Sequence, residues 1–184
     1  MTTTPNQNPY KVTTGKCRLC YTKNVLTPDE DGSYSLMILI PKTDTVTVNA
    51  LKNSIEKFKK DPKAEAKWGS KFLANMRTPL RDGDTERDLE KGPEFKGHYF
   101  LNCNTYTKPG VVDARMQEII NPSDIYSGCY GRVSVVPAAY NTDGNKGIKL
   151  YLNNVQKIAD GERLGGGGSN VNDDFTAVEE DFLS

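Results

Sequence analysis

Alternating apolar and polar positions predict five strands along the chain. Two of these stretches precede residue 41 and three follow residue 97, and the later ones are rich in Tyr, Val and Ile, which favour strands. Turn residues bound them: Pro28–Gly32 follows the first stretch, and Thr142–Asn145 contains the Asp-Gly pair of a tight hairpin. The predicted strands are Lys16–Thr27, Ser33–Ile40, His98–Tyr106, Ser127–Ala139 and Gly147–Ile158.

Helical spacing is found between the second and third predicted strands. Apolar residues there recur at intervals of three or four positions, which is typical of one face of an amphipathic helix. The pair Asp61-Pro62 combines an N-cap residue with a first-turn proline, so a second, short helix is predicted to run toward Trp68. Trp68 lies between Lys67 and Lys71 and is predicted to be a packing anchor. The apolar stripe of the first helix consists of Val48, Leu51, Ile55 and Phe58.

Five strands with helices inserted between them match an OB-type barrel, a five-stranded barrel whose exposed face and loops bind oligonucleotides. An α+β sandwich has the same strand count and remains the alternative. Residues 16–164 are enough for one domain with one core, and residues 1–15, rich in Thr, Asn and Pro, are predicted to form a flexible arm. The charged stretch Pro79–Gly97 is predicted to be a long surface loop.

The last twenty residues, Gly165–Ser184, differ from the rest in charge. They contain five acidic residues and no Lys or Arg, whereas the whole chain has 24 basic and 24 acidic side chains. Residues 1–164 therefore carry a formal net charge of +5. The glycine run predicts a flexible linker and a disordered acidic tail, which can dock on a partner protein or lie across a basic groove. The tail residues expected to bind partners are Asp173, Asp174, Phe175, Glu179, Glu180, Asp181 and Phe182.

Several features of the sequence bear on where the protein is located and on whether it binds a metal. No apolar run approaches the roughly 20 residues of a membrane span, and the N-terminus lacks the pattern of a signal peptide. We therefore expect a cytosolic protein with no membrane partner and with reduced cysteines. Cys17 and Cys20 have the C-x-x-C spacing of a zinc site, but Cys103 and Cys129 do not form a second such pair. On a strand, positions three apart point to opposite faces, so buried thiols and no metal site are expected.

The sequence lacks the marks of an enzyme. His98 is the one histidine, and the chain has no Walker A motif, no dinucleotide-binding glycine motif and no nucleophile elbow. The loop Arg81–Asp88 has acids at alternate positions, yet an EF-hand counted from Asp82 would place Arg87 and Pro93 where Gly and Glu are required. A solvated turn is favoured, and a metal-dependent nuclease that uses the Asp82–Asp88 loop is the alternative function. No cofactor is expected.

Aromatic and basic residues together suggest a surface for single-stranded nucleic acid. Nine Tyr, six Phe and one Trp are interleaved with Lys and Arg, and such surfaces stack bases on aromatic rings while cations neutralise phosphates. Strand alternation turns Cys129, Val133 and Val135 inward, and in the last strand Ile148, Leu150 and Leu152. The opposite face, with the end of the third strand, then presents Tyr126, Tyr130, Arg132, Lys149, Tyr151, Tyr106 and Lys108.

Six short motifs occur in order along the chain: Pro79–Asp84, Gly97–Asn102, Lys108–Asp113, Tyr126–Arg132, Gly144–Ile148 and Leu152–Gln156. They resemble those of a family of tailed-phage proteins, now understood as single-stranded DNA (ssDNA)-binding proteins with a modified OB fold and an acidic, disordered C-terminus. The resemblance extends from about Lys16 to Leu164 and is densest after Pro79.

The resemblance implies ssDNA binding by base stacking and phosphate contacts, in support of phage replication or recombination. It adds Arg81 to the candidate residues and supports Tyr126, Arg132 and Lys108, whereas the family pattern tolerates a small residue at Tyr151. The expected partners are ssDNA and, through the tail, phage or host replication proteins. The expected location is the cytoplasm of the infected bacterium.

Overall fold

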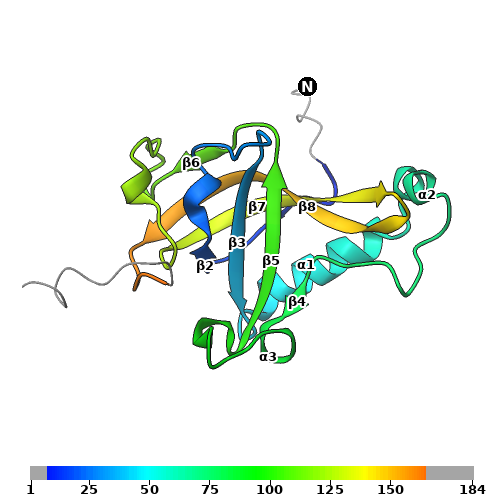
Figure 1. Cartoon of the computed structure of the whole chain (residues 1–184), viewed down its shortest axis with the longest axis horizontal. Helices are drawn as coiled ribbons and strands as arrows, with labels where there is room; N and C mark the ends of the chain where they lie inside the picture. The colour runs from blue at the N-terminus through cyan, green and yellow to red at the C-terminus, as the bar shows by residue number, and fades with distance from the viewer. Residues whose placement is uncertain (1–7, 165–184) are drawn as a thin grey trace, which may run out of the picture.

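The computed structural model describes residues 8–164 and contains a closed five-stranded barrel (Figure 1). The strands follow the order β2, β3, β5, β8 and β7, and β7 pairs with β2 to close the ring. The β5–β8 pair is parallel and the other four pairs are antiparallel. This closure confirms the OB-type barrel. The strands are β2 (Cys17–Cys20), β3 (Tyr34–Pro41), β5 (His98–Thr105), β7 (Tyr130–Thr142) and β8 (Asn145–Ala159).

Three very short strands extend this barrel at its edges. They are β1 (Val12–Thr13), β4 (Arg81–Asp82) and β6 (Gly110–Val112), which pair with β7, β5 and β8 respectively. The end of the segment predicted to be a flexible arm is thus part of the sheet. Nearby, the Tyr10 hydroxyl donates a 2.7 Å hydrogen bond to Asp61 Oδ2. This bond also fixes the segment to the turn between the two helices.

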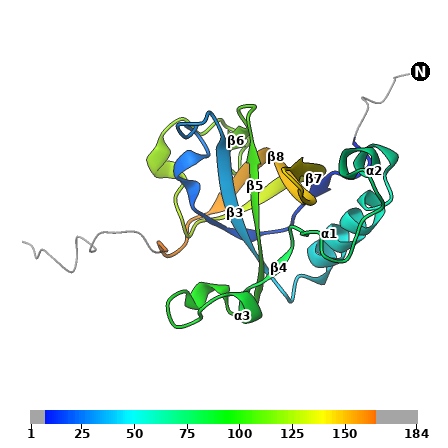
Figure 2. The same cartoon turned by 45° about the vertical axis from the view of Figure 1, so that its right-hand side comes forward.

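Two helices cover the side of the barrel next to the β7–β8 hairpin (Figures 1 and 2). Helix α1 (Thr45–Phe58) begins three residues before the predicted stripe, because Asp44 Oδ1 accepts a hydrogen bond from the Thr47 N–H and caps the helix. Helix α2 (Pro62–Trp68) begins and ends as predicted, with Asp61 as its N-cap. No helix among residues 8–164 is long and apolar enough to cross a membrane.

Trp68 is the packing anchor that the sequence predicts. Its side chain is fully buried, with 0 % exposure, and its Nε1–H donates a 3.0 Å hydrogen bond to the Gly147 carbonyl in β8. The ring makes edge-to-face contacts with Phe58 and Phe72. Through these contacts α2 holds the far end of the β7–β8 hairpin, whose turn has the left-handed residues Asp143 and Gly144.

The barrel interior follows the predicted alternation. In β7 and the residue before it the side chains of Cys129, Val133 and Val135 are buried, whereas Arg132 is exposed. In β8 Ile148, Leu150 and Leu152 are buried, whereas Lys149 and Tyr151 are half-buried. Period-two patterning therefore assigns the inner and outer faces of these two strands correctly.

The predicted length of the first strand, Lys16–Thr27, is wrong. Strand β2 ends at Cys20 because Tyr21 adopts a left-handed conformation, with φ 51°, and donates its N–H to Ser127 Oγ instead of a strand ladder. A 3₁₀ helix, η1 (Thr22–Asn24), follows. No alternation rule anticipates such a local reversal.

The prediction of a plain surface loop at Pro79–Gly97 is also wrong. This segment contains β4, helix α3 (Gly83–Glu86) and the 3₁₀ helix η2 (Pro93–Phe95). Phe95 packs at 81° against Phe100 of β5, on the outer face of the barrel. Isolated apolar residues within a charged stretch have no periodicity, so the pattern concealed this packing. A third 3₁₀ helix, η3 (Pro122–Asp124), precedes β7.

The four cysteines are buried free thiols. Cys17 packs in the barrel interior and Cys20 in the cluster on the outer face, as expected for strand positions three apart. Burial raises the pKa of both thiols to about 12, and it also raises the pKa of Cys103 and Cys129.

These thiols are expected not to react with a disulfide reagent in the folded protein at about pH 8, because the nucleophilic thiolate is absent there. All four should react after unfolding in guanidinium chloride. A spectrophotometric thiol titration measures the number of reactive thiols in the folded and in the unfolded protein. A variant with Thr43→Cys, at an exposed position, is the positive control. Reaction of a native thiol without unfolding would contradict the burial.

Candidate nucleic-acid interface

A groove follows the outer face of the β7–β8 pair. Strand pairing sets Arg132 beside Gln156 and Ser134 beside Asn154, and a bulge after Ser134 then brings Val136 beside Tyr151. β1 lies along one side, where Thr13 pairs with Ser134, and β6 lies along the other, where Gly110 pairs with Asn154. The floor of this groove therefore changes from cationic through polar to aromatic along the strands.

The parallel β5–β8 pair brings Tyr106 and Tyr151 to the same part of this face. Tyr151 pairs with Asn104, and Tyr106 is two residues beyond Asn104, so both residues share the outward face. The Tyr106 side chain is 68 % exposed. Lys149 Nζ lies 4.8 Å from the centroid of the Tyr151 ring, which places a cation beside this aromatic surface.

Two adjoining hollows form the groove. The first, of about 680 Å³, is lined by Tyr106, Lys108 and Tyr151 among others. The second, of about 470 Å³, is lined by Arg132 and Met116 among others. They are continuous because both hollows share three lining residues, Lys11, Ser134 and Asn154.

The charge of the groove has one sign. Among the described residues that line its two hollows, Lys11, Lys108 and Arg132 are cationic and none is Asp or Glu. The Arg132 guanidinium is oriented by a 3.3 Å hydrogen bond from Nε to the Thr14 carbonyl. An exposed and a half-buried tyrosine beside cations that no acid in the lining opposes are the components of a surface that binds single-stranded nucleic acid.

Comparison with known proteins agrees with this geometry. The family described as "Enterobacter phage Enc34, ssDNA-binding protein" matches residues 10–183. The chain belongs to this family. No curated protein matches the chain significantly. Because the Enc34 family and its structural relatives are ssDNA-binding proteins, which are non-enzymatic, the chain is not an enzyme.

Solved structures of phage ssDNA-binding proteins share the fold. The bacteriophage Enc34 protein is 23 % identical, with a TM-score of 0.72 over 90 % of this chain and 89 % of that one. The same protein in complex with ssDNA is 26 % identical, with a TM-score of 0.71 over 85 % and 90 % of the two chains. The gp2.5 protein of bacteriophage T7 is 18 % identical, with a TM-score of 0.61 over 92 % and 95 %.

In this member of the Enc34 family, three of the residues predicted from sequence lie away from the groove. Tyr126 precedes β7, and its hydroxyl donates to Asp160 Oδ1 and the Gly161 carbonyl, at 3.0 and 3.1 Å. The Tyr126 ring is flanked by Arg163 and Lys157, whose charged groups lie 4.3 and 5.1 Å from its centroid. Tyr126 is thus anchored at the end of β8, and its role in DNA binding stays a prediction.

Tyr130 and Arg81 are also placed elsewhere. Lys16 Nζ lies 4.8 Å and Arg18 Cζ lies 5.5 Å from the Tyr130 ring centroid, near β2. Arg81 Nε makes a 3.1 Å ion pair with Glu86, and its guanidinium covers the Phe100 ring at 5.2 Å. The structure therefore brings together Tyr106, Lys108, Arg132, Lys149 and Tyr151, and it separates the other three predicted residues from them.

The acidic loop is occupied by internal contacts. Lys42 Nζ lies 2.7 Å from Asp82 Oδ1 and 2.7 Å from Asp84 Oδ2, and these hydrogen bonds hold the pKa of both carboxyls below the usual range. Over residues 8–164 no group of three or more His, Cys, Asp or Glu side chains could hold a metal ion. The sequence favoured a solvated turn with local pairing of Arg and acidic residues. The Arg81–Glu86 pair is such a contact, whereas Lys42 comes from outside the loop.

Lys11 and Asn154 also line the groove, although neither was predicted from the sequence. Lys11 lies in the segment predicted to be a flexible arm, and the two-residue strand β1 that carries it to the groove has no periodicity to detect. Asn154 Oδ1 accepts the Gly110 N–H at 3.1 Å and fixes β6 against β8. Asn154 belongs to the motif Leu152–Gln156, which could have marked it as a candidate residue. Strand alternation alone did not distinguish it from its neighbours.

Proposed function

We propose that this protein binds ssDNA without sequence preference through the β7–β8 groove. The observation that carries the proposal is the groove itself: two tyrosines and three cations face one continuous surface that no acid lines among the described residues. Bases stack on Tyr106 and Tyr151, while Lys11, Lys108 and Arg132 neutralise phosphates. The ssDNA complex of the related Enc34 protein supports the ligand class.

Salt dependence tests the role of the cations. Parent protein is expected to bind labelled oligothymidylate in preference to duplex, and Lys108→Ala to reduce the slope of log K against log salt by about 0.7, the contribution of one phosphate contact on a single strand. Fluorescence anisotropy over a salt series measures both. Lys60→Ala, an exposed lysine after α1, is the matched control. Equal affinity for duplex and single strand at moderate salt would overturn the proposal.

The proposed biological role is protection of single strands during phage replication or recombination, in the cytoplasm of the infected bacterium. Membership of the Enc34 family supports this role. The acidic tail, Gly165–Ser184, lies outside the described residues, and its part in the proposal rests on its sequence. Its acids resemble phosphates and its Phe175 and Phe182 resemble bases, so the tail competes for the groove and, once DNA displaces it, recruits replication proteins.

A chain that ends at Leu164 is expected to bind ssDNA more tightly than the full chain, most clearly at low salt. A flexible segment of twenty residues has an average span of about 25 Å, and its local concentration on the order of millimolar is enough for weak competition. Anisotropy titrations of the two proteins measure the difference. Unchanged or lower affinity after deletion would restrict the tail to partner recruitment.

A further inference from the structure

Arg87 has a guanidinium group that forms no ion pair with an acid among residues 8–164. Its Cζ lies 4.3 Å from the centroid of the Phe95 ring and 5.0 Å from that of Phe100, and its Nη2 lies 4.0 Å from Met37 Sδ. Among residues 8–164, Arg87 Nε is the one buried side-chain nitrogen or oxygen without a hydrogen-bond partner. An orphaned donor of this kind calls for a structural or functional explanation.

The neighbouring acids have other partners. Glu86 accepts hydrogen bonds from Arg81 Nε and from the Asp82 N–H, and Asp88 Oδ1 accepts the Glu90 N–H. No ion pair within the described part of the chain includes Arg87. The half-buried guanidinium stacks on two aromatic rings, its Nε is buried and its Nη2 contacts Met37, so an anion can reach it from the side of Nη1.

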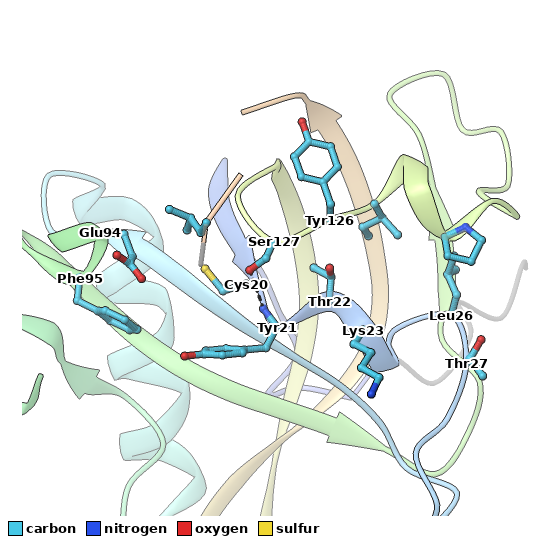
Figure 3. Close-up of a pocket in the computed structure, with 13 residues that line it drawn as sticks. Cys20, Tyr21, Thr22, Lys23, Leu26, Thr27, Glu94, Phe95, Tyr126 and Ser127 are labelled. Carbon is cyan, nitrogen blue, oxygen red and sulfur yellow. Dashed lines mark hydrogen bonds between the residues drawn. The ribbon is translucent and has the colours of Figure 1, made fainter. Parts of the chain in front are cut away.

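Tyr21 presents an aromatic ring on the same side of the barrel. Its side chain is 62 % exposed, although its backbone is held in the left-handed region at φ 51° by the hydrogen bond to Ser127 Oγ. A bulky residue in this conformation is strained, and such strain is concentrated at functional sites. Figure 3 shows the Tyr21 side chain extending from the end of β2 toward Phe95 across a hollow of about 530 Å³. We call this space the Tyr21 hollow.

Phe95 connects the Tyr21 hollow with Arg87, and a smaller hollow lies between it and the β7–β8 groove. Phe95 lines the hollow and carries the Arg87 guanidinium on its ring. Leu26 and Thr27 line the hollow on its other side, and they also line a smaller hollow of about 120 Å³ that reaches Lys108. Since Lys108 also lines the groove, three neighbouring depressions lie between Tyr151 and Tyr21.

We infer that the Tyr21 hollow and the neighbouring Arg87 together form a second contact site for the same DNA strand, in which a base stacks on Tyr21 and a phosphate binds Arg87. The inference rests on the proposed function and extends it from one groove to a path around the barrel. Lys23 and Glu94, the charged residues that line the hollow, offset each other, so Arg87 supplies the unbalanced positive charge. Single-stranded nucleic acid fits because it offers an aromatic face and a phosphate in every repeat.

Oligonucleotide length distinguishes this site from the groove. Fluorescence anisotropy with the full-length protein would compare oligothymidylates of about 6 and about 16 nucleotides, which span the range of sites on single OB folds. Tyr21→Ala and Arg87→Lys are each expected to weaken binding of the longer strand by about tenfold and to leave the shorter strand within about twofold of the parent. Tyr21→Phe keeps the stacking face and is expected to bind like the parent.

Each outcome decides between alternatives. Unchanged affinity of Tyr21→Ala for the longer strand would overturn the second site, and so would equal losses for both lengths, since these would place Tyr21 in the first site. A groove variant with Tyr106→Ala and Tyr151→Ala should lose affinity for both lengths. If that variant retains both while Tyr21→Ala loses both, the proposed groove fails instead. Thermal unfolding shows whether each variant is folded. Because Tyr21 is exposed, its substitution is expected to leave the fold intact, so Tyr21→Ala still tests the site if Arg87→Lys does not fold.

Discussion

Alanine at both Tyr106 and Tyr151 is expected to weaken ssDNA binding by about 2 kcal/mol or more, which is roughly 30-fold, because each stacked base contributes about 1 to 3 kcal/mol. The two rings share one face through the parallel pairing of Tyr151 with Asn104, so one strand of DNA is expected to contact both. Anisotropy titration of labelled oligothymidylate against the double variant measures the loss.

The double substitution Tyr106→Phe and Tyr151→Phe is the matched control. Phenylalanine retains the aromatic face and removes the hydroxyl, so this variant should bind within a fewfold of the parent. The same comparison can be made with Tyr126→Ala and Tyr130→Ala, whose rings already have cations beside them. Full affinity of the Tyr106 and Tyr151 alanine variant, combined with loss in the Tyr126 and Tyr130 variants, would move the site to the end of β8.

Trp68→Ala is expected to lower the free energy of unfolding by about 3 to 5 kcal/mol, the usual cost of removing a large buried aromatic side chain. The ring is fully buried between α2 and β8, in contact with Phe58 and Phe72. Its removal leaves a cavity and deprives the Gly147 carbonyl of its donor. Urea denaturation followed by far-UV circular dichroism measures the change.

Trp68→Phe separates packing from hydrogen bonding. It preserves most of the buried surface and loses the indole N–H, so the expected cost is roughly 1 to 2 kcal/mol, smaller than that of alanine. Trp68 is the one tryptophan of the chain, and its emission in the parent protein should have the short wavelength of a buried indole. A parent-like unfolding midpoint for Trp68→Ala would contradict the anchoring of the hairpin by α2.

Regular periodicity explains which parts of the fold could be predicted from the sequence. The stripe Val48 to Phe58 predicted α1, and the alternation at Leu150 and Leu152 predicted the faces of β8, because burial of one face imposes the period directly. The alternation gave a wrong face for Tyr126. Gly128 has a φ of 111°, so the extended conformation that alternation requires does not continue from Tyr126 into β7. Counting positions across that glycine placed Tyr126 on a face that it does not share with Arg132.

The candidate site depended on contacts that leave no local signal. Tyr106 and Tyr151 are 45 positions apart in the sequence and meet through the parallel β5–β8 pair, which neither strand pattern reveals. Likewise, the bonds from Lys42 to Asp82 and Asp84 occupy a loop that looks open in the sequence. Composition could indicate the kind of ligand, whereas the arrangement of the groove required the closed barrel.

Strand β8 is the last strand along the described part of the chain. Strand β8 pairs with β7, β5 and β6, and it supplies Tyr151 and Asn154 to the groove. A nascent chain in which β8 is still inside the ribosome lacks the complete core and the Tyr151 side of the proposed groove. Such a chain is therefore expected neither to fold nor to bind ssDNA until β8 has emerged.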